Sequence, residues 1–227
     1  MSFYLSKKAP VKDAMPPPQK GAARFFYLLI TQPMKLIWVN LLFILFCLPV
    51  VTAPAALSGL NRVCLLLVRE GTAYVWTDFI MEFRASFFKS IAVFVGCAVT
   101  APAAWLCLYV SRSIAQGMTA FILIMLAVLA LGWSLLMLCY AFPMLALCSL
   151  RAKEILRNAY SLILLEPKAD ILLLMLVGGG TAVFAGLLPY SLPLAVGLFS
   201  LLALAANTIA ANPLERRIVK SQNHTEI

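Results

Sequence analysis

Two long stretches without a charged side chain restrict most strongly what this chain can fold into. Residues 113–150 and residues 171–214 contain no Asp, Glu, Lys or Arg. A helix of about 20 apolar residues crosses a bilayer, and soluble domains seldom contain longer uncharged apolar runs. The composition agrees, because 63% of the 227 residues are hydrophobic and 12% are charged. We therefore predict an all-α fold, that of a polytopic helical membrane protein.

The apolar segments predict about six membrane passes. Residues 113–150 are too many for one crossing and too few for two, so we expect one long helix that bends near Pro143. A kink is also expected at Pro102, and the second uncharged stretch divides at the Leu-Pro-Tyr-Ser-Leu-Pro sequence of 188–193. With the second pass short or re-entrant, the passes are expected at 34–52, 53–69, 91–110, 118–146, 171–188 and 192–211.

Polar segments flank this membrane domain, which we place at 24–214. Residues 1–23 are rich in Lys and Pro and cannot bury a core, so we expect a flexible basic tail. Residues 215–227 are expected to form a second tail. The aromatic start of the domain, 24–32, is interpreted as an approach at the depth of the lipid headgroups.

Residues 76–90 have the pattern of an amphipathic helix at the membrane interface. Phe and Ile side chains recur at helical spacing on one face. Thr77 or Asp78 is the expected N-cap. The charged residues of the opposite face, which we expect to contact solvent, are Asp78, Glu82, Arg84 and Lys89.

The basic residues indicate the orientation. If 53–69 does not cross, Lys and Arg divide between the two sides as seven and eleven, and neither side is clearly cytoplasmic. If 53–69 returns through the membrane, 16 of the 18 lie on one side, with Arg112 opposite and Arg62 embedded. Short cytoplasmic loops carry such an excess. We therefore expect both termini in the cytoplasm and contact with anionic lipids there, and no nucleic-acid partner.

Several short segments in the first half of the chain carry a family resemblance. In order, they are Asn40-Leu41-Leu42, Leu48-Pro49-Val50-Val51-Thr52, Ala55-Ala56-Leu57, Leu67-Val68-Arg69, Asp78-Phe79, Phe83-Arg84, Phe87 and Lys89. This order resembles the YesL-like family of bacterial integral membrane proteins, a domain family of unknown function. The later Tyr140-Ala141-Phe142-Pro143 sequence also fits, so the likeness covers about 24–220.

The resemblance implies a protein of the bacterial plasma membrane that is often encoded near genes for carbohydrate uptake or polysaccharide degradation. It implies no established reaction. The chain departs from the family in its longer Lys/Pro tail and in Ala53-Pro54, where a more flexible pair is common.

The sequence contains no recognisable catalytic motif. Motifs of metalloproteases, serine hydrolases and nucleotide-binding loops are absent, and no carboxylate pair lies on an embedded helix face. The six cysteines lack the spacing of metal sites, and the single histidine, His224, lies in a polar tail. We expect no enzymatic activity, no metal and no cofactor.

A small set of polar residues lies within the predicted passes. An arginine within a membrane indicates a functional site by default, and we expect Arg62 to pair with Asn40 or with the helix end near Pro49. Alternatively, Arg62 reaches the interface or satisfies backbone carbonyls freed at the proline break. The candidate functional residues are Asn40, Asn61 and Arg62, and Asn207 is a further embedded polar residue.

Two further sets of residues are candidates for contacts. Gly178, Ala182 and Gly186 are spaced four apart, which lets helices pack closely. The second set is either a solvated face or a docking face for a cytoplasmic partner, and consists of Asp78, Arg84, Lys89, Arg151, Lys153 and Arg157.

These observations favour a non-enzymatic accessory or regulatory protein of carbohydrate uptake or utilisation, with a sugar ABC importer or another membrane protein as partner. The alternative is a small permease whose solute path lies near the Pro49 hairpin and Arg62. The sequence identifies neither the solute nor the partner, and it leaves open whether 53–69 crosses fully.

Overall fold

The structure is a computed structural model, and it describes residues 22–113, 116–147, 150–181 and 195–214. Within these ranges the chain is helical and contains no strand, so the all-α prediction is confirmed there. The tails at 1–21 and 215–227 and the turn at 188–193 lie outside the described residues. The elements are α1 (Ala22–Thr31), α2 (Pro33–Cys47), η1 (Val50–Thr52), α3 (Ala53–Glu70), α4 (Val75–Ala85), α5 (Phe87–Ala98), α6 (Ala101–Ser113), α7 (Met118–Leu147), α8 (Ala152–Leu165), α9 (Pro167–Leu173), the π-helical turn η2 (Leu174–Gly178) and α11 (Ala195–Leu214).

The chain enters the helical domain through a bent pair. α1 and α2 meet at an angle of 86° at Gln32. The buried Arg24 of α1 donates hydrogen bonds to the carbonyl oxygens of Val68 and Leu67, at 3.0 and 3.4 Å. A basic side chain is favourable at the carbonyl end of a helix. α1 therefore closes the end of α3, in the segment expected to lie at the lipid headgroups.

α3 is the central helix of the protein. Pro54 occupies its first turn, where no backbone N–H is needed, and the helix continues unbroken to Glu70. The segment predicted to be short or re-entrant is thus a continuous helix, and Val50–Glu70 is long and apolar enough to cross a membrane. α3 packs against α2, α4, α5, α7 and α11, and 61% of the residues in its most apolar window are buried.

The interfacial helix is shorter than predicted. α4 ends at Ala85 rather than at residue 90: the backbone of Ser86 leaves the helical conformation, and its side chain donates to the Glu82 carbonyl oxygen (2.7 Å). Residues 87–90 form the first turn of α5 instead. α5 and α6 are separated by a break at Val99 and Thr100, just before Pro102, as the expected kink requires. Together, 87–113 form a stretch long enough to cross a bilayer.

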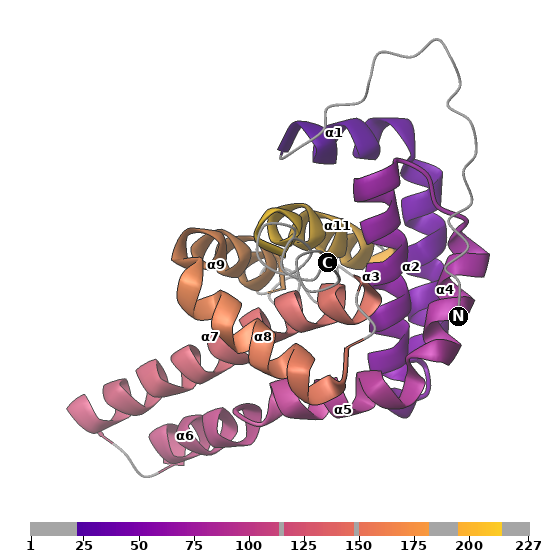
Figure 1. Cartoon of the computed structure of the whole chain (residues 1–227). Coiled ribbons are helices and arrows are strands. Elements are labelled where there is room, and N and C mark those ends of the chain that lie inside the picture. The colour runs from indigo at the N-terminus through magenta and orange to yellow at the C-terminus, as the bar shows by residue number, and fades with distance from the viewer. Residues whose placement is uncertain (1–21, 114–115, 148–149, 182–194, 215–227) are drawn as a thin grey trace, which may run out of the picture.

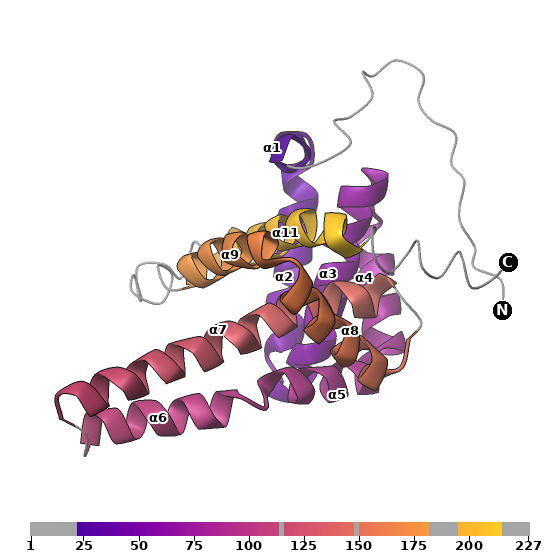
Figure 2. The same cartoon turned by 60° about the vertical axis from the view of Figure 1, so that its left-hand side comes forward.

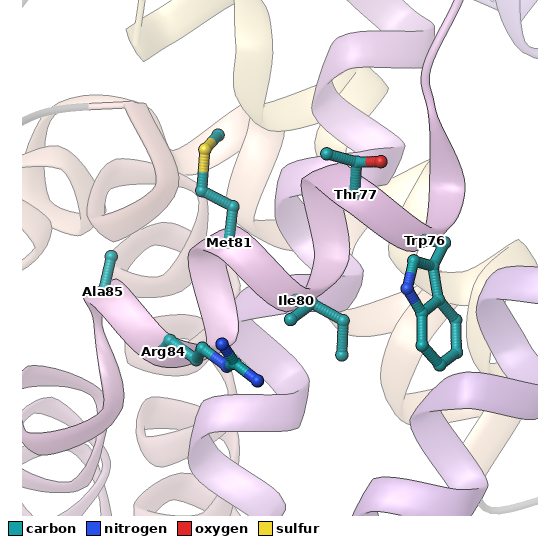
Figure 3. A pocket seen from close by; sticks show the side chains of 6 residues that line it. All are labelled: Trp76, Thr77, Ile80, Met81, Arg84 and Ala85. Atoms are coloured by element: carbon teal, nitrogen blue, oxygen red, sulfur yellow. The ribbon is translucent and has the colours of Figure 1, made fainter.

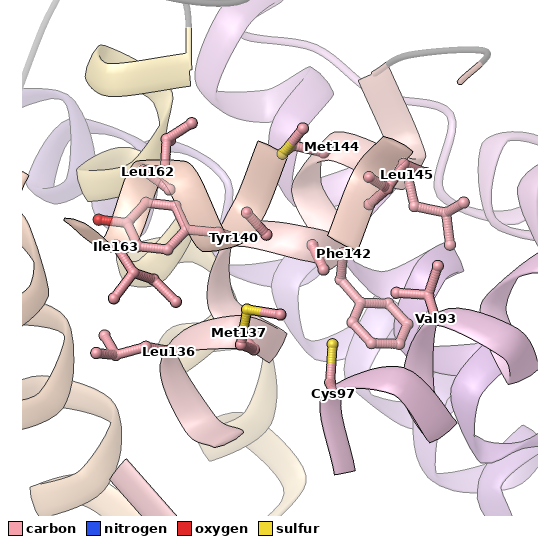
Figure 4. Packing of buried hydrophobic residues seen from close by; sticks show 14 of the residues in the cluster. Val93, Cys97, Leu136, Met137, Tyr140, Phe142, Met144, Leu145, Leu162 and Ile163 are labelled. Carbon is pink, nitrogen blue, oxygen red and sulfur yellow. The ribbon is translucent and has the colours of Figure 1, made fainter. Parts of the chain in front are cut away.

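α7 is a single helix of 30 residues that contains Pro143, in agreement with the predicted long helix. Its second half forms the larger hydrophobic core with α5 and α8. Figure 4 shows the ring of Phe142 pointing toward Val93 and Cys97, while Tyr140 lies toward Leu162 and Ile163. All four of these neighbours are buried. This packing fixes α8 beside the end of α7.

The helices do not share one direction. α6 and the first half of α7 form a two-helix arm that extends away from the rest of the molecule, and α2 and α3 run across α7 in both views (Figures 1 and 2). By length and composition, three of the described helices can cross a membrane, or four if α1 and α2 count as one broken span. The six predicted passes are therefore not confirmed, while a helical protein with several membrane-spanning helices is supported.

Candidate functional site

A cluster of polar side chains joins α3, α4 and α7. Ser58 donates to Oε1 of Glu82 at 3.1 Å, and the hydroxyl oxygens of Ser58 and Ser86 lie 2.8 Å apart. Arg62, one turn after Ser58 on α3, donates from a terminal guanidinium nitrogen to the carbonyl oxygen of Ala146 at 2.6 Å. We call Ser58, Arg62, Glu82, Ser86 and this carbonyl the α3–α4 polar cluster.

Glu82 was placed on the charged face of the predicted helix, but it is only partly exposed. Periodicity placed it opposite the aromatic residues, but its carboxylate reaches inward to Ser58. Burial raises the pKa of Glu82, and this effect outweighs the hydrogen bonds from Ser58 and Ser86 and the positive charges of Arg62 and Lys89, which lower it. The only sequence signal for this site is that Glu82 lies close to the aromatic residues Phe79 and Phe83.

Arg62 pairs with a different group from those expected. Its partner is the Ala146 carbonyl near the end of α7, and not Asn40 or the helix end near Pro49. The last carbonyls of a helix lack intrahelical partners, so a cationic donor there is favourable. The alternative interpretation, that Arg62 satisfies freed backbone carbonyls, describes this contact better, although the carbonyl belongs to α7 and not to the proline break. The Nε atom of Arg62 is buried without a partner.

Asn61 and Asn207 form a buried amide pair between α3 and α11. Nδ2 of Asn207 donates to Oδ1 of Asn61 at 2.8 Å and to the Ala203 carbonyl at 2.7 Å. Nδ2 of Asn61 donates to the Leu57 carbonyl at 2.8 Å. The two side chains are 6% and 0% exposed. A hydrogen bond between residues 146 positions apart fixes the last helix against the central one.

The three predicted functional residues therefore do not form one site. Asn61 and Arg62 are adjacent in sequence but point toward α11 and α7, respectively. Asn40 is fully buried on α2. The structure adds Glu82 and Asn207 to the interactions of α3, and Asn207 had been identified only as an embedded polar residue.

The outer side of α4 carries a shallow groove. Figure 3 shows Trp76, Ile80 and Arg84 along one edge of the helix, and Thr77 and Met81 along the other. Trp76 is 64% exposed and Met81 and Arg84 are also exposed. On its inner side, the ring of Phe79 is fully buried. α4 thus has an exposed aromatic and cationic surface, while its opposite face is held by the buried ring of Phe79.

The predicted docking face is distributed over α4, α5 and α8. The carboxylate of Asp78, which is half-exposed, accepts the backbone N–H of Tyr74 at 2.8 Å and so holds the start of α4. The N-cap residue is Tyr74, and neither Thr77 nor Asp78. α8 begins after Arg151, whose backbone N–H donates to Glu154 at 3.1 Å. The exposed cations of the predicted face are Arg84, Lys89, Arg151, Lys153 and Arg157.

The predicted small-residue face is only partly described. Gly178 is in ordinary contact distance of Leu135, since a Cβ there would lie 3.6 Å from Cδ2 of that residue. Ala182 and Gly186 lie outside the described residues. A closer approach, which the prediction missed, is at Gly180: a Cβ there would lie 2.7 Å from Cδ2 of Leu202 on α11.

A second buried polar contact was not predicted. The hydroxyl of Tyr140 on α7 donates to Oδ1 of Asp170 on α9 at 2.8 Å, and both side chains are buried. Among the residues that the structure describes, no group of three or more His, Cys, Asp or Glu side chains is arranged to hold a metal ion. The Tyr140–Asp170 contact therefore links α7 and α9.

Comparison with known proteins gives a family match over part of the chain. Residues 36–111, about a third of the chain, match the family model described as "Protein of unknown function, DUF624". The match runs from α2 to α6 and includes Asn61, Arg62 and Glu82. Neither the curated proteins nor the solved structures contain a match to this chain. Residues 36–111 are thus similar to a domain whose function is unknown, and they overlap the segments that carry the YesL-like resemblance.

Proposed function

We propose that this protein is a non-enzymatic accessory or regulatory membrane protein that acts through the outer surface of α4. One observation carries the proposal: α4 is fixed against α3 by Phe79 and Glu82, and it presents Trp76, Met81 and Arg84 outward. Trp, Met and Arg are enriched where proteins bind other proteins. A preorganised helix loses little conformational entropy when it binds.

The partner and the location form part of the same proposal. The YesL-like resemblance points to the bacterial plasma membrane and to carbohydrate uptake or utilisation, with a sugar ABC importer or another membrane protein as the partner. The charge distribution favours a cytoplasmic position for α4 and for both termini. Lys89 and Arg151 extend the basic surface and would contact anionic lipids beside the partner.

Genetic complementation in the native host tests this proposal. We expect deletion to reduce uptake of a sugar served by neighbouring genes, and full-length wild-type protein to restore it. The double variant Trp76→Ala/Arg84→Glu should reach the membrane but fail to restore uptake. Trp105→Ala is the matched control, because Trp105 is 74% exposed on the α6–α7 arm and not on α4. Unchanged uptake after deletion, or full restoration by the double variant, would contradict the proposal.

The permease remains the second candidate, favoured by the buried Nε of Arg62, which has no partner and so retains an N–H for a solute. The geometry supports it less, because another nitrogen of the same guanidinium is engaged by Ala146. Solute flux in reconstituted vesicles that is lost in Arg62→Ala would favour transport. Equal flux in vesicles with and without the protein would exclude it for the solutes tested.

A further inference from the structure

The contact between α3 and α11 borders a cavity of about 160 Å³ that also reaches α2, α7 and η2. An apolar cavity of about 150 Å³ in another protein stays dry and binds benzene. The cavity here is therefore large enough for a six-membered ring or a short alkyl chain. Most of its wall is apolar, including Phe43, Leu57, Leu60, Leu138, Phe199 and Leu202.

Asn61 and Thr181 are the polar side chains in this wall. The Thr181 hydroxyl is engaged by the carbonyl oxygens of Val177 and Gly178, at 2.9 and 3.0 Å. Asn61 has one Nδ2 hydrogen on Leu57 and therefore retains a second one. Its partner Asn207 uses both Nδ2 hydrogens, but its Oδ1 is buried without a hydrogen bond.

Buried polar atoms are nearly always hydrogen-bonded, so the unused capacity of the amide pair needs an explanation. Of the pair, Asn61 lies in the wall of the cavity, and the oxygen of a hydroxyl group can accept the N–H that Asn61 retains. A carboxylate ligand fits less well, because no cationic side chain belongs to the wall of the cavity.

The surroundings of the cavity indicate how a ligand would reach it. Thr181 is exposed and follows η2, and the exposed neighbours on this helix include Leu172 and Met175. The described helix surface beside Thr181 is therefore partly apolar, as is expected of a surface that faces lipid. Val177 of the π-helical turn contributes to the wall, and π-helical turns are frequent at functional sites.

From this geometry we infer that the cavity binds a bilayer-soluble alcohol or phenol. The ring or short chain occupies the apolar space, and the hydroxyl oxygen accepts the remaining Nδ2 hydrogen of Asn61. This inference is independent of the surface on α4, so either can fail without the other.

Competitive photolabelling of the full-length protein in lipid nanodiscs tests it. A diazirine derivative of phenol should label 135–139 of α7, and unlabelled phenol should compete more strongly than benzene at equal concentration in the bilayer. A buried hydrogen bond between neutral groups corresponds to a preference on the order of tenfold. Equal competition by phenol and benzene, or labelling only outside the cavity, would overturn the inference.

A pair of variants provides the control. Ala203→Leu adds bulk to the wall and keeps both amides, so labelling of 135–139 should fall at least on the order of tenfold. Ala103→Leu adds the same bulk at an exposed position of α6 and should label as the wild type does. Undiminished labelling of Ala203→Leu would also overturn the inference. The comparison of phenol with benzene needs no variant and decides the question if Ala203→Leu does not fold.

Discussion

The hydrogen bond between Tyr140 and Asp170 offers a measurable test of what holds α9 in place. Tyr140→Phe removes one oxygen atom and keeps the buried ring, so it creates almost no cavity. A hydrogen bond to a charged acceptor contributes about 1.5–3 kcal/mol, because its loss leaves a buried acceptor unsatisfied. The 2.8 Å distance and the burial of both residues place this contact in that range. We expect Tyr140→Phe to lower the free energy of unfolding by about 2 kcal/mol.

A double-mutant cycle separates this contact from other effects of the substitution. The assay is reversible unfolding in mixed micelles, followed by tryptophan fluorescence, to which Trp133 contributes from a position 5.4 Å (ring centroids) from Tyr160. We expect Tyr140→Phe and Asp170→Asn to couple by at least about 1 kcal/mol. Tyr109→Phe is the matched control, since Tyr109 is exposed on α6 and its change should stay within about 0.5 kcal/mol. Additive effects of the two core substitutions would refute the reasoning.

Two further predictions concern α3 and α4. Because burial raises the pKa of Glu82, the folded protein binds a proton at this carboxylate more tightly than the unfolded chain does. The free energy of unfolding should therefore fall as pH rises from 4.5 through the raised pKa. Denaturant titrations at several pH values should show a smaller fall for Glu82→Gln, and an equal fall in the variant and the wild type would contradict this reasoning. Gly59→Ala should destabilise the protein by about 1–3 kcal/mol, since its Cβ would lie 2.9 Å from the Phe79 ring and 3.1 Å from the Phe79 carbonyl oxygen. Gly132→Ala is the control, because a Cβ at Gly132 would lie at an ordinary 3.5 Å from Leu174. This substitution should leave the free energy of unfolding unchanged or raise it by up to about 1 kcal/mol. Equal losses of stability for the two variants in thermal unfolding would refute the steric argument.

Much of the helical pattern could be predicted from the sequence because each helix depends on local signals. The long uncharged stretch required one helix, and α7 is that helix. Pro102 indicated the break between α5 and α6. The length of α4 could not be predicted, because it depends on the side chain of Ser86. Hydropathy did not identify α3 as a full-length helix because Asn61 and Arg62 lower its apolar average, although both are engaged by other helices.

The partners of the polar residues were beyond sequence reasoning for a different physical reason. Helical periodicity says which residues share a face, but it does not say what that face meets. Glu82 shared a face with exposed residues, yet its carboxylate reaches Ser58. The partner of Arg62 lies 84 positions away and is a backbone carbonyl, which leaves no pattern in a sequence. The same holds for Asn61 and Asn207, whose pairing depends on how α11 returns to α3.

The crossing of α2 and α3 over α7 restricts how the protein can sit in a bilayer. Membrane helices tilt by about 20° on average and by up to about 40° from the bilayer normal. If α7 lies along the bilayer normal, α2 and α3 are strongly tilted from it, and if α2 and α3 lie along the normal, α7 is strongly tilted (Figures 1 and 2). In a bilayer, α7 would therefore tilt to one side of the normal, and α2 and α3 to the other. A measurement of the tilt of α7 relative to the bilayer normal would consequently also restrict the tilt of α3, which carries Arg62.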